Sequence, residues 1–153
     1  MWRSYNQNLL KKALSSSTLE EVACIQPPLI TVKFCVCCLV TVFLNDQQIL
    51  SAEMVDKMFD NHSGDHEVKL GSWGDMGFGS EANWGLGFMV HPVGTSFGRS
   101  ENSASWGGLF NSYFWIDKET GIAGIFATQL FPFFDERVIK HYNAFESEVY
   151  KAL

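Results

Sequence analysis

Two segments of the chain have the apolar spacing of amphipathic helices. In residues 50–59, Ser51 stands at an N-cap position, Glu53 follows in the first turn, and apolar residues recur at 54, 55, 58 and 59. Leu50 and Val55 occupy the two positions of a hydrophobic staple. The pattern predicts a short helix that ends near Asn61.

The second helical pattern follows Asp135, which is the predicted N-cap of a C-terminal helix. Apolar residues recur at helical spacing at Val138, Ile139, Tyr142, Phe145 and Val149. On the same pattern, the charged residues Lys140, Glu146 and Glu148 are expected to face water. We expect the apolar stripe of this helix to pack on a sheet.

The stretch between the helices, residues 84–130, has the pattern of β-strands. Trp84–Val90 predicts a first strand, and a second begins at Ser105–Gly108 after a polar turn. Asp117–Gly121 predicts a tight hairpin, and Pro132 ends the third strand. The chain therefore reads as an α+β fold, with an antiparallel sheet of about three strands, a short helix before it and an amphipathic helix packed on it.

Glycines interrupt these strands in an unusual way. Trp106 is followed by Gly107 and Gly108, which remove two consecutive side chains from the backbone. Glycine inside a strand marks a bulge or the close approach of another group to the main chain. The pair predicts a sheet edge that is open for docking.

The segment before residue 46 differs from the rest. It contains Pro27-Pro28 and an apolar run, residues 29–44, that Lys33 interrupts. A membrane span needs about 20 apolar residues, so a buried strand within 34–44 is favoured over a membrane segment. A third interpretation is that this part is not a naturally selected piece of the fold. We divide the chain into an atypical segment, 1–45, and a domain, 46–153.

The sign of the net charge also changes at about residue 45. The net charge is −6, and residues 1–45 carry four basic and two acidic side chains, so the remainder is strongly acidic. With 46% hydrophobic and 18% charged residues the chain is globular in type. Without a cluster of Lys and Arg we expect no nucleic-acid partner.

Cysteine and histidine positions do not make a metal site. The cysteines at 24, 35, 37 and 38 lie close together, which is unlike a disulfide framework and favours a reducing, cytoplasmic location. We interpret them as small buried apolar residues. His62 and His66 lie in the glycine-rich loop 62–83, and His91 and His141 have no evident partner. We therefore expect no metal and no cofactor.

Four segments carry a resemblance to a known family: ILSAEMVDKMF at 49–59, WGLGF at 84–88, SASWGG at 103–108 and FWIDKETGIAGIFATQL at 114–130. Residues 49–153 resemble the C-terminal portion of the serine β-lactamase-like family, in its class C and esterase or transesterase branch. In that family a serine of an S-x-x-K motif attacks an ester or lactam carbonyl, and a Tyr of Y-x-N and the Lys handle the proton.

The resemblance implies roles for four residues. Trp106, Gly107 and Gly108 match the family's third motif, which is Lys-Thr-Gly in β-lactamases and often Trp-Gly-Gly in esterases. The backbone N–H of Leu109 would then be one of two oxyanion donors. Trp in place of Lys removes the cation that would hold a β-lactam carboxylate, so the resemblance implies small neutral ester or acyl substrates.

The other two family motifs are missing. No lysine has a serine three positions before it, and no Tyr begins a Y-x-N. The first hypothesis is thus a C-terminal part of a β-lactamase-like esterase or transesterase that is inactive alone. The alternative is a non-catalytic module that holds a partner with its sheet edge and the tryptophans at 73, 84, 106 and 115. A third hypothesis, an anchor at 29–44, is the least favoured.

Overall fold

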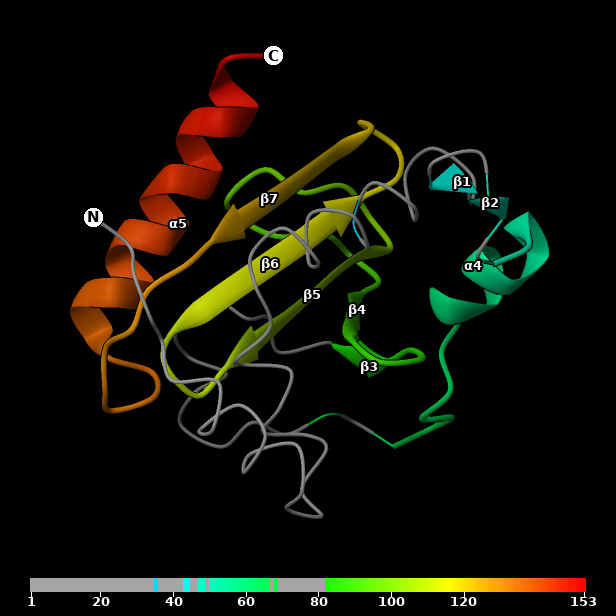
Figure 1. Ribbon diagram of the computed structural model, residues 1–153, viewed down its shortest axis with the longest axis horizontal. Helices are drawn as coiled ribbons and strands as arrows, with labels where there is room; N and C mark the ends of the chain where they lie inside the picture. The colour runs from blue at the N-terminus through cyan, green and yellow to red at the C-terminus, as the bar shows by residue number, and fades with distance from the viewer. Residues whose placement is uncertain (1–34, 36–42, 45–46, 49, 67, 69–81) are drawn as a thin grey trace.

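A five-stranded antiparallel sheet organises the chain (Figure 1). The computed structural model describes residues 35, 43–44, 47–48, 50–66, 68 and 82–153. Each strand of the sheet pairs with the next one along the chain. The strands are β3 (Asn83–Trp84), β4 (Met89–His91), β5 (Ser103–Gly108), β6 (Ser112–Asp117) and β7 (Ile122–Phe126).

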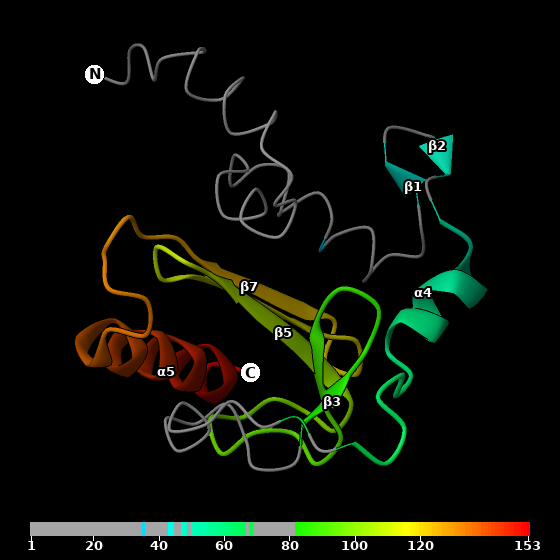
Figure 2. The same cartoon turned by 90° about the horizontal axis from the view of Figure 1, so that it is seen from below.

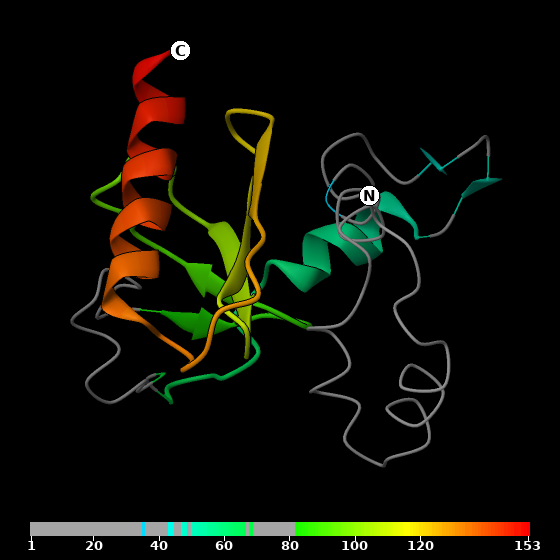
Figure 3. The ribbon, with the colours of Figure 1, turned by 60° about the vertical axis from the view of Figure 1, so that its left-hand side comes forward.

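Helices lie on opposite sides of this sheet. Figure 3 shows α5 (Glu136–Lys151) on one side and α4 (Ala52–Met58) on the other. Figure 2 shows the axis of α5 lying along its face of the sheet. A separate short ladder pairs β1 (Phe43–Leu44) with β2 (Gln47–Gln48). The arrangement confirms the predicted α+β fold with a C-terminal helix packed on an antiparallel sheet.

Both helices begin where the sequence predicts. Ser51 caps α4 through a hydrogen bond from the backbone N–H of Met54. Asp135 caps α5 by accepting from the N–H groups of Arg137 and Val138. A side-chain acceptor satisfies backbone donors that lack partners in the first turn, typically for about 1 kcal/mol. The α4 helix ends at Met58, slightly before the predicted end at Asn61.

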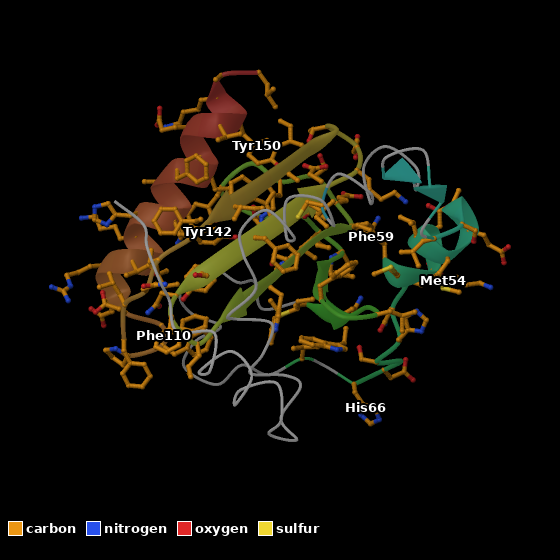
Figure 4. All side chains as sticks on the ribbon, in the orientation of Figure 1. Met54, Phe59, His66, Phe110, Tyr142 and Tyr150 are labelled. Atoms are coloured by element: carbon orange, nitrogen blue, oxygen red, sulfur yellow. The ribbon has the colours of Figure 1, made fainter. Side chains whose placement is uncertain are left out.

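Alternating residues of each strand divide the core into two clusters. The cluster between the sheet and α5 is largely aromatic, and the rings of Trp115 and Tyr142 lie with centroids 5.8 Å apart. Figure 4 shows Tyr142 on the side of α5 that faces the sheet. In the opposite cluster, Val55 of α4 and Phe59 just after it pack against Ala104 and Ile116 of the sheet and Phe88 of the turn before β4. Together the two clusters use both faces of the central strands.

Cys35 belongs to the cluster on the α4 side, where its side chain is buried. This agrees with its interpretation as a small apolar residue. The remaining cysteines, and most of the predicted buried strand in 34–44, lie outside the described residues. The boundary between residues 45 and 46 stays a prediction.

The predicted strand Trp84–Val90 is wrong, because these residues form a hairpin instead. The Gly85 N–H donates to the Phe88 carbonyl at 2.9 Å, and Gly87 has φ of 93°, which favours glycine. A Cβ on Gly85 would lie 2.2 Å from the Met58 carbonyl oxygen. Gly85 therefore lets the end of α4 approach the hairpin between β3 and β4.

The second predicted strand also contains an unpredicted turn. Strand β5 ends at Gly108 and β6 begins at Ser112, so Leu109–Asn111 reverse the chain. Asn111 makes this possible with φ of 58°, a conformation that Asn tolerates better than most residues. These two turns account for five strands where about three were expected.

Glu146 was expected to face water, and this expectation is wrong. Its side chain is fully buried on the sheet side of α5. Phe145, assigned to the apolar stripe, is instead 39% exposed. The buried face of α5 therefore includes the Glu146 carboxylate in place of the Phe145 ring. Glu146 can be buried because Arg99, from the loop between β4 and β5, pairs with it.

Candidate functional site

The second half of β5 has an open backbone edge. Strand β4 pairs with β5 only through Met89↔Ser105, Val90↔Ala104 and His91↔Ser103, whereas β6 pairs with β5 through Gly108. On the side away from β6, no strand in the described part of the chain continues along 106–108. β5 as a whole is the middle strand, so the predicted edge is confined to these three residues.

Gly107 has a packing role that its sequence context does not reveal. It lies opposite Tyr113 in the β5–β6 register, and an added Cβ would meet the Tyr113 ring at 2.5 Å. Gly124 stands in the same relation to Trp115, with a closest approach of 2.0 Å. Aromatic rings therefore cover both glycines on the α5 face. Because residue 107 has no side chain, the Tyr113 ring can pack over its backbone on the α5 face.

Trp106 and Trp84 form an aromatic pair beside the open edge. Their ring centroids are 4.6 Å apart with the planes at 90°, and both side chains are half-buried. Trp115, in contrast, is fully buried and cannot contact a partner chain. Trp73 lies outside the described residues. Four tryptophans were assigned to partner binding. The structure brings Trp84 and Trp106 together, and burial excludes Trp115 from contact with a partner.

Leu109 begins the turn that follows the open edge. The Asn111 N–H donates to the Gly108 carbonyl at 2.9 Å, which closes the turn around Leu109 and Phe110. Both apolar side chains are exposed. The three residues matched to the third motif, Trp106–Gly108, therefore end β5, and Leu109, the residue assigned as oxyanion donor, follows them in an exposed turn.

Asn111 fixes this turn to the loop before α5. Its buried amide donates to the carbonyls of Leu130 and Pro132, at 2.9 and 2.8 Å. Its Oδ1 accepts from the Tyr113 hydroxyl and the Asp135 N–H, at 2.8 and 3.1 Å. The side chain thus uses all its hydrogen-bonding capacity within the protein. Sequence reasoning missed it, since each of its loop partners lies at least 19 positions away.

A buried His–Ser pair lies on the α5 face next to the motif. His91 Nε2 is 2.7 Å from Ser105 Oγ, and both side chains are almost completely buried. Burial, reinforced by the positive charge of Arg99, lowers the pKa of His91 to about 3. A neutral imidazole beside a hydroxyl resembles a nucleophile–base pair. However, Ser105 has no solvent exposure, so no substrate can reach its oxygen.

An ion pair buried behind the sheet ties the loop after β4 to α5. Arg99 Nε lies 2.8 Å from Glu146 Oε1, which also accepts from Thr95 Oγ1 at 2.8 Å. Burial alone would lower the pKa of Arg99, but Tyr142 and Glu146 raise it above its ordinary value. Arg99 therefore stays charged, and its bond to Glu146 holds the loop against the helix.

Asp117 organises the opposite end of the sheet. Burial alone would raise the pKa of its carboxyl, but hydrogen bonds from the Ser100 and Thr120 N–H groups and the Tyr150 hydroxyl lower it below its ordinary value. Tyr150 extends from the end of α5 toward the sheet (Figure 4). Asp117 thus stabilises the hairpin to β7, as its place in that predicted turn suggests.

The other titratable candidates are structural. His62 bonds the Lys57 carbonyl at 2.7 Å, and His141 bonds the Arg137 carbonyl at 2.6 Å. His66 is exposed in the loop (Figure 4). Within the described ranges, His, Cys, Asp and Glu side chains form no group of three able to hold a metal ion. In the same part of the chain no helix has the length and apolar character needed to cross a membrane.

Comparison with known sequences agrees with the resemblance. A family model described as Beta-lactamase matches residues 31–148. No curated protein matches the chain.

Comparison with solved structures shows the same fold in simvastatin synthase. Simvastatin synthase (LovD) from Aspergillus terreus, as the LovD6 mutant, superposes with a TM-score of 0.58 at 21% identity, covering 68% of this chain and 29% of that one. Its unliganded selenomethionyl form gives a TM-score of 0.56 at 22% identity, covering 69% and 30%. The chain thus spans less than a third of the length of these structures.

Proposed function

Because the chain belongs to the beta-lactamase family, we propose that Trp106–Leu109 form the oxyanion-side wall of an acyl-ester transfer site. The observation that carries the proposal is the bare backbone of β5 beyond the end of β4. A substrate carbonyl needs such a stretch, because side chains or a neighbouring strand would keep it away from the main chain.

The wall acts on the developing negative charge. When a serine oxygen attacks an ester carbonyl, the carbonyl oxygen gains charge that a fixed backbone N–H can stabilise. The Leu109 N–H is the donor that we assign to this role. One such donor contributes about 3 kcal/mol to the transition state, which is a factor of about 10² to 10³ in rate.

Substrate charge follows from the residues around the wall. Trp106 stands where a β-lactamase has a lysine, and no Lys or Arg occurs between Arg99 and Lys118. Arg99 is itself buried and paired with Glu146. Without a cation in the wall and its flanking strands, a carboxylate on the substrate would lose its hydration with no compensation from this segment. Neutral esters are therefore the preferred substrate class.

The nucleophile and base are proposed to come from a segment other than these 153 residues. The chain has neither S-x-x-K nor Y-x-N. Its buried Ser105 cannot replace the missing serine, because the site proposed for the carbonyl lies at the strand edge and Ser105 faces α5. We therefore expect the chain alone to release no chromophore from a short-chain chromogenic ester. Turnover above the buffer rate would contradict this.

A graft tests the wall itself. Residues 46–153 would replace the matching segment of simvastatin synthase (LovD), and turnover of a neutral chromogenic ester would be measured. Leu109→Pro deletes the N–H that the wall supplies, and we expect kcat to fall about 10² to 10³-fold. Leu109→Ala keeps the N–H and is the matched control, with a change below about threefold expected when the ester is a short acetyl ester. Equal rates in the two variants, both folded by circular dichroism, would remove Leu109 from the oxyanion site.

One observation favours a second function, a non-catalytic module. The Trp84–Trp106 pair is half-buried beside an open strand edge, which is how a sheet accepts an extended peptide. An inactive graft would favour this function, whereas an active graft whose rate depends on the Leu109 N–H would favour acyl transfer.

A further inference from the structure

Four exposed apolar side chains gather at the end of the sheet where β5 stops. Leu109 and Phe110 belong to the β5–β6 turn, and Leu130 and Phe131 to the loop before α5. Their exposed fractions are 38%, 40%, 54% and 68%. The rings of Phe110 and Phe131 lie 6.4 Å apart, and Figure 4 shows Phe110 at this end of the sheet. We call these four residues the apolar tip.

The apolar tip is held in place by polar contacts beneath it. The Phe110 carbonyl accepts from the Leu130 N–H at 3.3 Å and from Thr128 Oγ1 at 2.7 Å. Asn111 donates to the Leu130 carbonyl from the other side. The two segments are thus fixed to one another although neither belongs to a strand there. A preorganised surface loses less entropy when a ligand binds.

These four side chains are exposed to solvent, so packing of the core does not explain why they are apolar. Nine large hydrophobic side chains are exposed in the described part of the chain, and four of them form the tip. The other five are Met54, Leu86, Val93, Phe145 and Leu153. Single exposed apolar residues are ordinary, whereas a contiguous patch marks a binding surface.

The tip adjoins the proposed oxyanion donor. Leu109 supplies both the proposed oxyanion donor and the first side chain of the tip, so a bound carbonyl and the tip are neighbours. No charged residue occurs in 103–116 or 122–134, the two segments that build this end of the sheet. The tip thus offers apolar contact without an ionic partner.

We propose that the apolar tip binds the acyl chain of the ester whose carbonyl meets the Leu109 N–H, and so selects longer, uncharged acyl groups. The proposal rests on the function proposed above. Phe110 and Phe131 are its specificity-determining residues, because they are its two aromatic side chains and their rings lie within contact of each other. A short acetyl group would gain nothing from them.

Binding to the full chain tests the tip without requiring turnover. Ethyl acetate and ethyl hexanoate would be titrated into the protein, and amide and methyl NMR shifts followed. The hexanoyl chain carries four more methylenes, and partial burial of them predicts at least tenfold tighter binding of ethyl hexanoate, with shifts at Leu109, Phe110 and Phe131. Equal affinity for both esters, or shifts that map elsewhere, would overturn the proposal.

Variants separate the tip from the rest of the surface. Phe110→Ser and Phe131→Ser should each weaken hexanoate binding about three- to tenfold, while Phe110→Leu should largely preserve it. Val93→Ser removes a comparably exposed apolar residue outside the tip, 65% exposed against 68% for Phe131, and should change nothing. Unchanged binding in Phe131→Ser overturns the proposal even if Phe110→Ser fails to fold.

The same protein variants also distinguish acyl binding from a dimer interface and from a failure of the oxyanion role. A dimer in sedimentation that Phe131→Ser dissociates would make the tip a protein interface and overturn acyl binding. Failure of the oxyanion role alone would leave hexanoate binding intact while Leu109→Pro and Leu109→Ala grafts turn over equally. Loss of chain-length preference with a rate that still depends on the Leu109 N–H would reject only the tip.

Discussion

Individual buried polar residues hold this fold at its turns and loops. Asn111, His91 and Asp117 are each nearly or fully buried, and each bonds a group distant in sequence. A buried polar atom that loses its partner costs about 1–3 kcal/mol, so single substitutions at these positions are informative.

Asn111→Asp should lower the free energy of unfolding by about 3 kcal/mol, because Asp cannot donate to the carbonyls of Leu130 and Pro132. Asn102→Asp is the control, since Asn102 has a similar positive φ, 57°, but is exposed. Urea denaturation measures both variants. Equal losses would mean that the backbone conformation, and not the amide, determines the effect at 111.

His91 should make stability depend on pH. Its pKa is about 3 in the folded protein against an ordinary 6.5, so between these values the unfolded chain binds an extra proton. The free energy of unfolding should therefore fall as pH drops from 6.5 toward 4, by at most about 1.4 kcal/mol per unit. The lowered pKa of Asp117 acts in the same direction, but only below its ordinary value of 3.8.

Removing the imidazole checks this assignment. In His91→Gln the slope of stability against pH should flatten between 4.5 and 6.5, while any loss below 4 remains. Urea unfolding at half-unit pH steps measures the slope. A slope that persists in the variant would assign the proton to another group.

At the scale of elements, α5 is fixed by one charged pair as well as by its apolar face. Arg99 and Glu146 lie 47 positions apart in sequence and meet behind the sheet at 2.8 Å. A buried pair contributes little net stability when intact, but breaking it leaves a charge buried without compensation.

Glu146→Leu should therefore cost about 3–5 kcal/mol, because Arg99 would keep its charge in the core. Glu148→Leu, on the exposed face of the same helix, should change stability by less than about 1 kcal/mol. Thermal and urea unfolding measure both. The double change Arg99→Met with Glu146→Leu should recover much of the loss, and failure to recover would point to packing of α5 rather than charge.

At the scale of the whole molecule, the sheet is covered by α5 on one face and by α4 with Cys35 on the other (Figure 3). Cys35 precedes the predicted domain boundary and yet is buried in the core. The segment 1–45 therefore contributes at least one side chain to the folded body.

Deleting residues 1–45 should lower the free energy of unfolding by at least about 1–2 kcal/mol, since it leaves the space of Cys35 empty. Cys35→Ala in the full chain is the matched comparison for that side chain. If the deletion leaves stability unchanged in urea, the body 46–153 folds independently of the segment, as the sequence division supposes.

Much of the fold follows from local patterns. The two helices begin at Ser51 and Asp135 because neighbouring N–H groups need a side-chain acceptor, and that need is visible in sequence. The hairpin at Asp117–Gly121 is equally local. The motif Trp106–Gly108 was found from its glycines and the family resemblance, and the structure adds that β4 does not pair with β5 there.

The rest depended on contacts between distant segments. The sequence by itself determined the α+β class, the helix starts and the position of the motif, because capping and periodicity act over a few residues. Only the tertiary structure decided that Glu146 is buried, that Gly107 makes room for Tyr113 and that Leu109 and Phe131 share one surface. Each of these results depends on a residue brought close by the sheet register or by a loop, and residue type alone does not specify that partner.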